Sequence, residues 1–82
     1  MRMMITIHVD TQHVDTILSL IPAEQEHIKE LKARGIVEAI YISADRTMVW
    51  LIMKGESREQ IEQELHSFPL YPYMKSEFVP LT

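Results

Sequence analysis

The chain has 82 residues, a formal net charge of −4 and no cysteine, which predicts a single domain over residues 1–82 with no disulfide to support its core. The acidic balance disfavours a nucleic-acid surface, because such surfaces need clustered Lys and Arg. The sequence shows neither a charged-then-apolar leader nor an apolar run of about 18 residues, so we expect no signal peptide, no membrane span and a cytoplasmic location.

The apolar share of the sequence is 46%, which is high for so short a chain. A domain of this size buries only about 60% of its unfolded surface, so its own core is small. Obligate homodimer interfaces are typically large and apolar. We therefore expect part of the apolar surface to lie between two copies of the chain.

The chain opens on a predicted strand. Residues 3–9, MMITIHV, are mostly β-branched or apolar, which is typical of a strand. Asp10 or Thr11 then offers a helix N-cap. The spacing of apolar residues over residues 13–21 predicts a short helix.

A second, longer helix is predicted from Pro22 to about residue 34. Proline fits the first turn of a helix, where its missing N–H has no partner to lose. Ile28 and Leu31 give this helix an apolar side. Gly35 follows as the residue type that most often ends a helix with a positive φ.

Two strands and a short polar turn come next. Residues 36–43 and 47–54 predict an antiparallel hairpin, because only a few turn residues separate them. The second of these strands, TMVWLIMK, is almost continuously apolar, which indicates that both of its faces are covered. We expect one face to meet the helices and the other to meet a partner subunit.

The last third of the chain predicts a helix and a final strand. Ser57 and Gln60 form a capping box that begins a helix reaching about Ser67. Pro69 ends that helix, because the residue before a proline resists helical geometry. With a strand near 73–80, the order is β-α-β-β-α-β, the ferredoxin-like α+β arrangement of a four-stranded antiparallel sheet with two helices on one face.

One segment carries a family resemblance. FPLYPYM, residues 68–74, resembles the Leu-Pro-Leu-Phe-Pro-Tyr-Met segment of the muconolactone isomerase family. The match runs over about residues 22–81, and its other shared positions are Glu24, Glu26, Leu31, Gly35, Ala44, Ser57, Glu59, Leu65, Glu77 and Leu81. The resemblance implies a dimeric α+β barrel, in which the sheet faces of two subunits pack together and dimers can assemble further. It also implies a double-bond shift in an unsaturated lactone, by removal and return of a proton, without a metal or an organic cofactor.

The same resemblance nominates a catalytic glutamate, and two nearby residues are candidates to assist it. Glu24 falls where the family has a helical glutamate, which we interpret as the acid–base group, and burial would raise its pKa into a useful range. His27, one turn further on, would orient or relay, and Tyr71 would assist. A simpler interpretation of Glu24 remains open: at the third position of a helix, a carboxylate favours the positive end of the helix dipole.

Four residues are candidates for substrate binding: Tyr41, Trp50, Arg46 and Tyr73. Tyr41 and Trp50 lie on the predicted hairpin, where each ring either lines an apolar pocket or packs in the core or the dimer interface. Arg46 lies at the hairpin tip, where it either meets an anionic substrate or is simply solvated. The prolines at 69 and 72 would hold Tyr71 and Tyr73 at a rigid corner, beside a pocket or as an aromatic plug.

His8, Asp10 and His13 form an H-x-D-x-x-H pattern whose ligand types suit zinc or iron. The spacing matches no established motif, and Asp10 already has a role as a helix cap, so no metal site is predicted. No glycine-rich phosphate loop is present either, and the chain has only two glycines. No cofactor is therefore expected.

These observations favour a cofactor-independent proton-transfer isomerase that acts on a small unsaturated lactone or a related apolar metabolite. The alternative is a non-catalytic small-molecule-binding or assembly domain of the same barrel type, and a third reading is a cofactor-independent monooxygenase. An apolar cavity that contains Glu24, Tyr71 and Trp50 would weigh against a domain whose interior is simply packed.

Overall fold

The computed structural model describes all residues from 1 to 82. Its elements confirm the predicted β-α-β-β-α-β order, with a single 3-10 turn added before the last strand. In chain order they are β1 (Arg2–Val9), α1 (Val14–Ala33), β2 (Val37–Ile42), β3 (Met48–Lys54), α2 (Arg58–His66), η1 (Tyr71–Tyr73) and β4 (Met74–Leu81). The four strands form one sheet in the order β2-β3-β1-β4, and every neighbouring pair is antiparallel.

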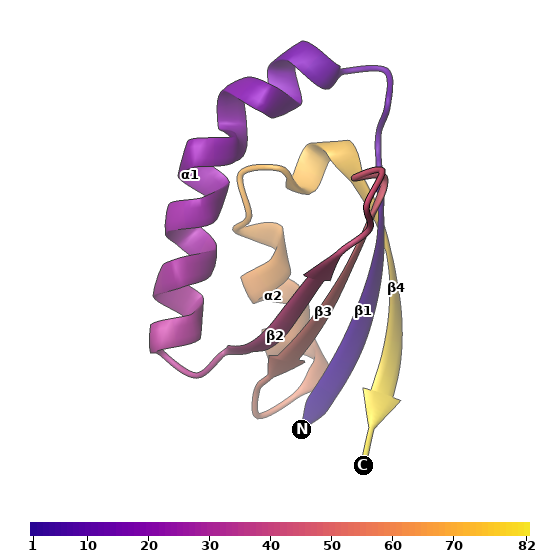
Figure 1. The fold of residues 1–82 in the computed structure, drawn as a ribbon. Helices are drawn as coiled ribbons and strands as arrows, with labels where there is room; N and C mark the ends of the chain where they lie inside the picture. Colours follow the sequence, from indigo (N-terminus) through magenta and orange to yellow (C-terminus); the bar gives the residue numbers. More distant parts are fainter.

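Both helices lie on the same side of the sheet (Figure 1). Because side chains alternate between the two faces of a strand, β1 and β3 each send every second residue toward the helices. Ile5 and Leu51 are paired in the register and are at most 1% exposed. They pack with Leu31 of α1 and with Ile61 and Leu65 of α2 in one continuous core. We call this helix-covered side the inner face.

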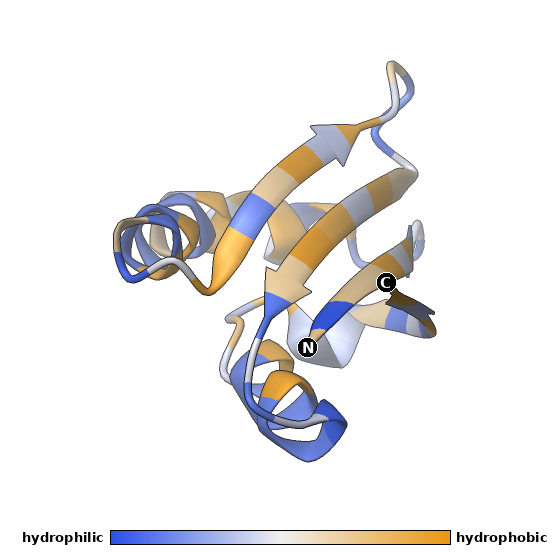
Figure 2. Ribbon diagram, turned by 90° about the horizontal axis from the view of Figure 1, so that it is seen from below, coloured by the Kyte–Doolittle hydropathy of each residue, from blue (hydrophilic) through white to orange (hydrophobic).

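The opposite side of the sheet, the outer face, has no helix over it. The register places Trp50 between Thr6 and Tyr41, and Ile52 between Met4 and Ala39. Figure 2 shows the alternation of hydrophobic and hydrophilic residues along the strands. Within one subunit the helices therefore cover only one face of β3, and Tyr41 is 63% exposed on the other.

The first helix differs from the sequence prediction. Residues 14–33 form one helix with Pro22 inside it, instead of a short helix followed by a second one that begins at the proline. A proline within a helix removes one backbone hydrogen bond and bends the axis, but packing on either side can keep the helix intact. The first turns of α1 accordingly run across the end of the molecule, and the remainder runs beside the sheet (Figure 1).

The residues at the helix ends agree in part with those predicted from the sequence. His13, not Asp10 or Thr11, is the N-cap of α1, and its side chain makes no capping bond. The C-terminus follows the prediction: Gly35 has φ of 76° and Ile36 N–H donates to Leu31 O over 2.9 Å, as in a Schellman motif. The predicted cap of α2 is confirmed, since Ser57 Oγ accepts from Gln60 N–H over 3.1 Å. Neither helix combines the length and apolar character that a transmembrane segment requires.

Candidate active site

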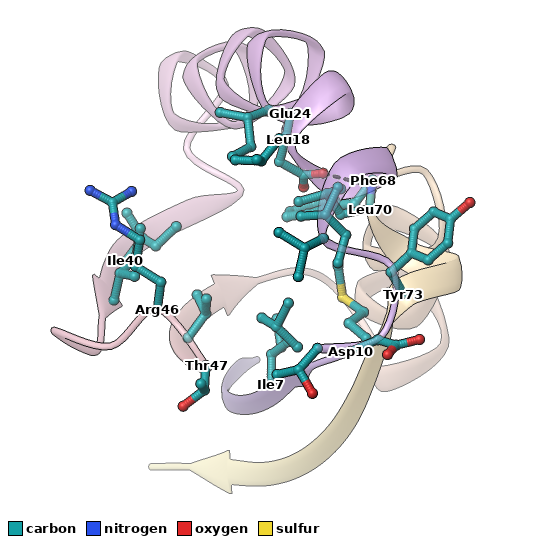
Figure 3. Close-up of a pocket in the computed structure, with 18 of the residues that line it drawn as sticks. Ile7, Asp10, Leu18, Glu24, Ile40, Arg46, Thr47, Phe68, Leu70 and Tyr73 are labelled. Atoms are coloured by element: carbon teal, nitrogen blue, oxygen red, sulfur yellow. Dashed lines mark hydrogen bonds between the residues drawn. The ribbon is translucent and has the colours of Figure 1, made fainter.

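A cavity of about 350 Å³ lies between α1 and the inner face of the sheet. Its walls come from α1, from the adjoining ends of β1, β2 and β3, from the β2–β3 turn, and from residues 68–74 (Figure 3). Hydrophobic residues make up 15 of the 22 that line it, so the space suits a small apolar ligand better than a strongly hydrated one. The apolar walls include Ile7, Ile17, Ile21, Ile28, Ile40, Val49, Leu51 and Phe68.

Glu24 projects from the middle of α1 into this cavity. It is 7% exposed and is the only charged residue of the chain that is buried. Burial raises the pKa of the Glu24 carboxyl above its ordinary value of 4.5, and a hydrogen bond from the Leu70 N–H opposes that rise. Because α1 begins at Val14 and not at Pro22, Glu24 is far from the helix N-terminus, and the dipole interpretation of this residue does not apply.

The hydrogen bond to Glu24 comes from the corner made by residues 68–71. Leu70 N–H donates to Glu24 Oε2 over 2.7 Å. Tyr71 N–H donates to Phe68 O over 2.9 Å, and Leu70 has φ −86° and ψ 1°, which are the values of the third residue in a type I turn. The N–H of that third residue takes no part in closing such a turn, so the Leu70 N–H is free to point at Glu24.

His27 and Tyr71 are close to this corner but do not line the cavity. His27 Nε2 lies 2.8 Å from Ser67 Oγ. The Ser67 hydroxyl itself donates to Glu64 O over 2.6 Å, so the histidine nitrogen is the donor in the first contact. His27 also meets Phe68 edge-on, with ring centroids 5.2 Å apart, and so ties α1 to the end of α2 behind the cavity wall.

The two tyrosines of the corner pack against histidines and make no hydrogen bond to Glu24. The Tyr71 ring packs on His66 with centroids 4.4 Å apart. Tyr73 does line the cavity, but its ring lies 5.5 Å from that of His13, and its hydroxyl points away from Glu24 (Figure 3). The Tyr73 hydroxyl is therefore not directed at the buried carboxyl in this structure.

The rim of the cavity carries charged residues from two turns. Asp10 accepts from Gln12 N–H over 2.7 Å and contacts His13 Nδ1 over 2.7 Å, and these two contacts lower the pKa of Asp10. Arg46, at the hairpin tip, is exposed and adopts φ of 62°, a left-handed conformation that is uncommon outside glycine.

Asp45 holds the hairpin turn from within. Its Oδ1 accepts from the Ser43 hydroxyl over 2.7 Å, from the Thr47 hydroxyl over 2.8 Å and from Thr47 N–H over 3.0 Å. These hydrogen bonds lower the pKa of Asp45, the one from Ser43 most of all. Both aspartates at the rim are therefore ionised, and each stabilises its own turn.

The sequence profile of the family described as muconolactone delta-isomerase matches residues 1–82. The chain belongs to the muconolactone delta-isomerase family. No curated protein matches the sequence. Among solved structures, this family member is similar to 5-chloro-2-hydroxyhydroquinone dehydrochlorinase from Burkholderia phenoliruptrix AC1100, solved in complex with 2,5-dihydroxybenzoquinone. The TM-score is 0.84 at 15% identity, over 100% of this chain and 94% of the other, which shows a shared fold.

The remaining predicted residues of this muconolactone delta-isomerase family member lie elsewhere. Tyr41 and Trp50 are directly opposite each other on the outer face, outside the cavity. Of the seven predicted site residues, the cavity brings together Glu24, Arg46 and Tyr73. An apolar cavity with Glu24 is present, but it contains neither Tyr71 nor Trp50.

The fold separates the first residue of the H-x-D-x-x-H pattern, His8, from the other two. His8 lies on the exposed side of β1, where its Nε2 is 3.8 Å from Glu77 Oε1 across the sheet. Asp10 and His13 pair with each other instead. The structure forms no group of three or more His, Cys, Asp or Glu side chains that could hold a metal ion.

Sequence reasoning missed two parts of the site in this family member. One is the Leu70 N–H, a backbone group; the Pro69 turn was a signal for it, because a type I turn leaves that N–H unused. The other is the part of the cavity wall made by Val14, Leu18 and neighbouring residues at the start of α1. Their helical spacing identified an apolar stripe, but it did not show that this stripe encloses a cavity.

Proposed function

We propose that this protein is a cofactor-independent isomerase that moves a double bond within a small unsaturated lactone or a related apolar ring compound. The observation that carries the proposal is the state of Glu24: a buried carboxyl in an apolar cavity, with Oε2 held by Leu70 N–H and Oε1 without a hydrogen-bond partner in the protein. A fixed carboxyl with one free oxygen and a raised pKa is suited to accepting and returning a proton.

The proposed reaction uses Glu24 as both base and acid. Glu24 Oε1 removes a proton from a ring carbon conjugated with the lactone carbonyl, and the C–H electron pair delocalises into an enolate. The same oxygen then returns the proton to the carbon at the other end of the conjugated system, so the double bond shifts and no other atom is gained or lost. Because one group on one wall performs both steps, both occur on the same face of the ring.

The developing enolate oxygen needs a hydrogen-bond donor. Gln25 lines the cavity and carries side-chain N–H groups that can donate this bond, whereas the Thr47 hydroxyl already donates to Asp45. In this proposal His27 and Tyr71 are positioning residues: His27 supports Phe68 from behind, and Tyr71 closes the turn that presents the Leu70 N–H. Tyr73 and Arg46 contact the bound molecule at the rim.

The family and the solved neighbour support a small unsaturated ring as the ligand. The family is described as muconolactone delta-isomerase, and the neighbour holds 2,5-dihydroxybenzoquinone. Neither identifies the substrate of this chain. The cavity volume of about 350 Å³ falls within the range of ordinary ligand pockets, which is about 300–1,000 Å³.

The experiment that tests this proposal follows the double-bond shift by NMR. A β,γ-unsaturated lactone incubated with the protein in D₂O should shift its double bond, and it should gain deuterium only to the extent that the protonated Glu24 exchanges with solvent before it returns the proton. The wild-type chain should accelerate the shift, and Glu24→Gln should not. Equal rates for the two proteins would remove Glu24 from the mechanism, and no acceleration across a set of unsaturated lactones and phenolic rings would refute the isomerase assignment.

We also propose that two copies of the chain pack through their outer faces, and that such dimers are the unit of any larger assembly. Trp50, Ile52 and Met4, which are half-buried, form an apolar patch there over which neither helix of the same chain lies, and Val79 is 52% exposed beside it. Obligate dimer interfaces have this apolar character. The arrangement leaves each cavity on the far side of its own sheet, next to the helices.

A further inference from the structure

We propose that the substrate is a neutral ring compound with an apolar substituent, and that this substituent leaves the cavity across an apolar collar formed by Val14, Leu18 and Ile42. The inference rests on the proposed function, in which the reacting ring lies against Glu24. The inference specifies the chemistry of the substituent that extends toward solvent: this substituent is apolar and is not a carboxylate.

The collar is defined by side chains that line the cavity and are nevertheless exposed. Val14 is 53% exposed, Leu18 58% and Ile42 56%, although all three line the cavity. Half of the six large exposed hydrophobic residues of the chain therefore gather at this one opening. Scattered exposed apolar residues are ordinary, but a group around the mouth of an apolar cavity marks a place where apolar material binds.

The bend in α1 explains how the collar arises. Val14 and Leu18 are four residues apart, so they lie on the same side of the helix. Pro22 bends the helix beyond them, and its first turns run across the end of the molecule (Figure 1). Ile42 ends β2 and also lines the cavity. The collar thus continues the apolar walls outward from the cavity.

The charges around the cavity disfavour an anionic substituent. Three acidic residues line it, Asp10, Glu24 and Asp45, against one basic residue, Arg46. The hydrogen bonds described above keep both rim aspartates ionised, and Glu24 must itself be ionised to act as a base. A second anion in the same apolar space would be repelled and poorly solvated. The Arg46 guanidinium, moreover, is turned away from Glu24 (Figure 3).

The test uses a series of butenolides whose ring carries a methyl, propyl or hexyl group, together with the carboxymethyl analogue, which is similar in length to the propyl compound. Dissociation constants are measured by calorimetry on the full chain. We expect the dissociation constant to fall about two- to fourfold for each added methylene, as expected for partial to full burial of a CH₂ group. The carboxymethyl compound should bind about tenfold more weakly than the propyl compound, because it places a second anion in the cavity.

Collar variants locate the effect. Leu18→Ser and Ile42→Ser should each remove most of the extra affinity for the hexyl compound and weaken binding of the methyl compound much less. Val79→Ser is the matched control, because Val79 is 52% exposed and lies on β4, outside the cavity lining. It should alter neither affinity. Melting temperatures without ligand show that all three variants are folded.

The outcomes separate this inference from the proposed function. If no butenolide binds, both are wrong. If the methyl compound binds but chain length has no effect, only the collar inference is wrong. It is also wrong if the carboxymethyl compound binds best and Arg46→Ala abolishes that preference, or if Leu18→Ser changes only the sedimentation of the protein, because the collar would then be a contact between copies of the chain.

Discussion

Leu70 and Glu24 are 46 positions apart in the sequence, yet the Leu70 N–H donates to Glu24 Oε2 over 2.7 Å. This bond joins the two features that carry the family resemblance, the proline-rich corner and the helical glutamate. It leaves Oε1 as the Glu24 oxygen that has no hydrogen bond within the protein. A rigid corner is useful here because a backbone donor fixed by a turn needs no side-chain ordering to hold the carboxyl in place.

Replacement of the buried carboxyl should separate activity from stability. Glu24→Gln keeps the size of the side chain and an oxygen that accepts from Leu70 N–H, so the melting temperature should change little. The isomerisation rate should fall by about 10²–10⁴-fold, the range typical of a lost general base. Glu26→Gln, an exposed position on the same helix, is the control and should alter neither quantity. A matching loss of stability in Glu24→Gln would make Glu24 a structural residue instead.

The raised pKa of Glu24 predicts two pH dependences. The rate kcat/KM should rise with pH as Glu24 ionises, with a midpoint above 4.5. In the folded protein Glu24 holds its proton to a higher pH than in the unfolded chain. Between 4.5 and the raised value the folded state binds more protons, so the free energy of unfolding falls as pH increases.

Urea titrations at a series of pH values check this slope, and Glu24→Gln should reduce it. Asp10 and Asp45 have pKa values below their ordinary 3.8, so their contributions have the opposite sign and are lost as the pH falls below about that value. The two effects therefore occupy different pH windows. A slope above pH 4.5 that is identical in wild type and Glu24→Gln would contradict the assignment.

The two prolines of the corner should differ in their effect on the acid–base group. Pro69→Ala and Pro72→Ala each give the unfolded chain more freedom and should lower stability by about 0.4–1 kcal/mol. Only Pro69 occupies the second position of the turn that presents the Leu70 N–H. Because that bond lowers the pKa of Glu24, Pro69→Ala should move the midpoint of the kcat/KM profile upward. Equal midpoints in the two variants would separate the turn from the chemistry.

Two helix ends could be predicted from the sequence. Ser57 marked the start of α2 and Gly35 the end of α1, because capping depends only on residues that are close in the chain. Pro22 misled the assignment of α1, because packing on both sides of the bend kept the helix continuous. Trp50 could not be placed from its alternation alone: alternation shows that Trp50 and Leu51 face opposite ways, but the helices decide which of those faces is the core. Pro22 marks the position of the bend in α1, but no local pattern shows that the bent helix encloses a cavity.

Because Arg46 has a left-handed conformation, Arg46→Gly should not lower the stability of the protein as most substitutions by glycine do. With φ of 62°, a non-glycine residue is strained by about 1 kcal/mol or more, which glycine relieves. Arg46→Gly should therefore leave the melting temperature unchanged or raise it by a few degrees, since glycine also increases the freedom of the unfolded chain. Ala44→Gly, in the same turn but without a positive φ, should lower it. Calorimetry of the two variants decides, and a lower melting temperature for Arg46→Gly would show that its side chain stabilises the turn.

The proposed pairing of outer faces is tested by placing a charge at the centre of the sheet. Trp50 lies on β3 between Thr6 and Tyr41, so a lysine there would bury an unpaired charge between two subunits. If the proposed pair forms, Trp50→Lys should prevent it, and the mass measured by sedimentation should fall toward that of one chain, 9.6 kDa. Gln63→Lys, an exposed position of α2, is the control for added charge and should leave the mass unchanged. A wild-type chain that is well folded as a single subunit at micromolar concentration would rule out the pairing, because its small core would then be sufficient without a partner.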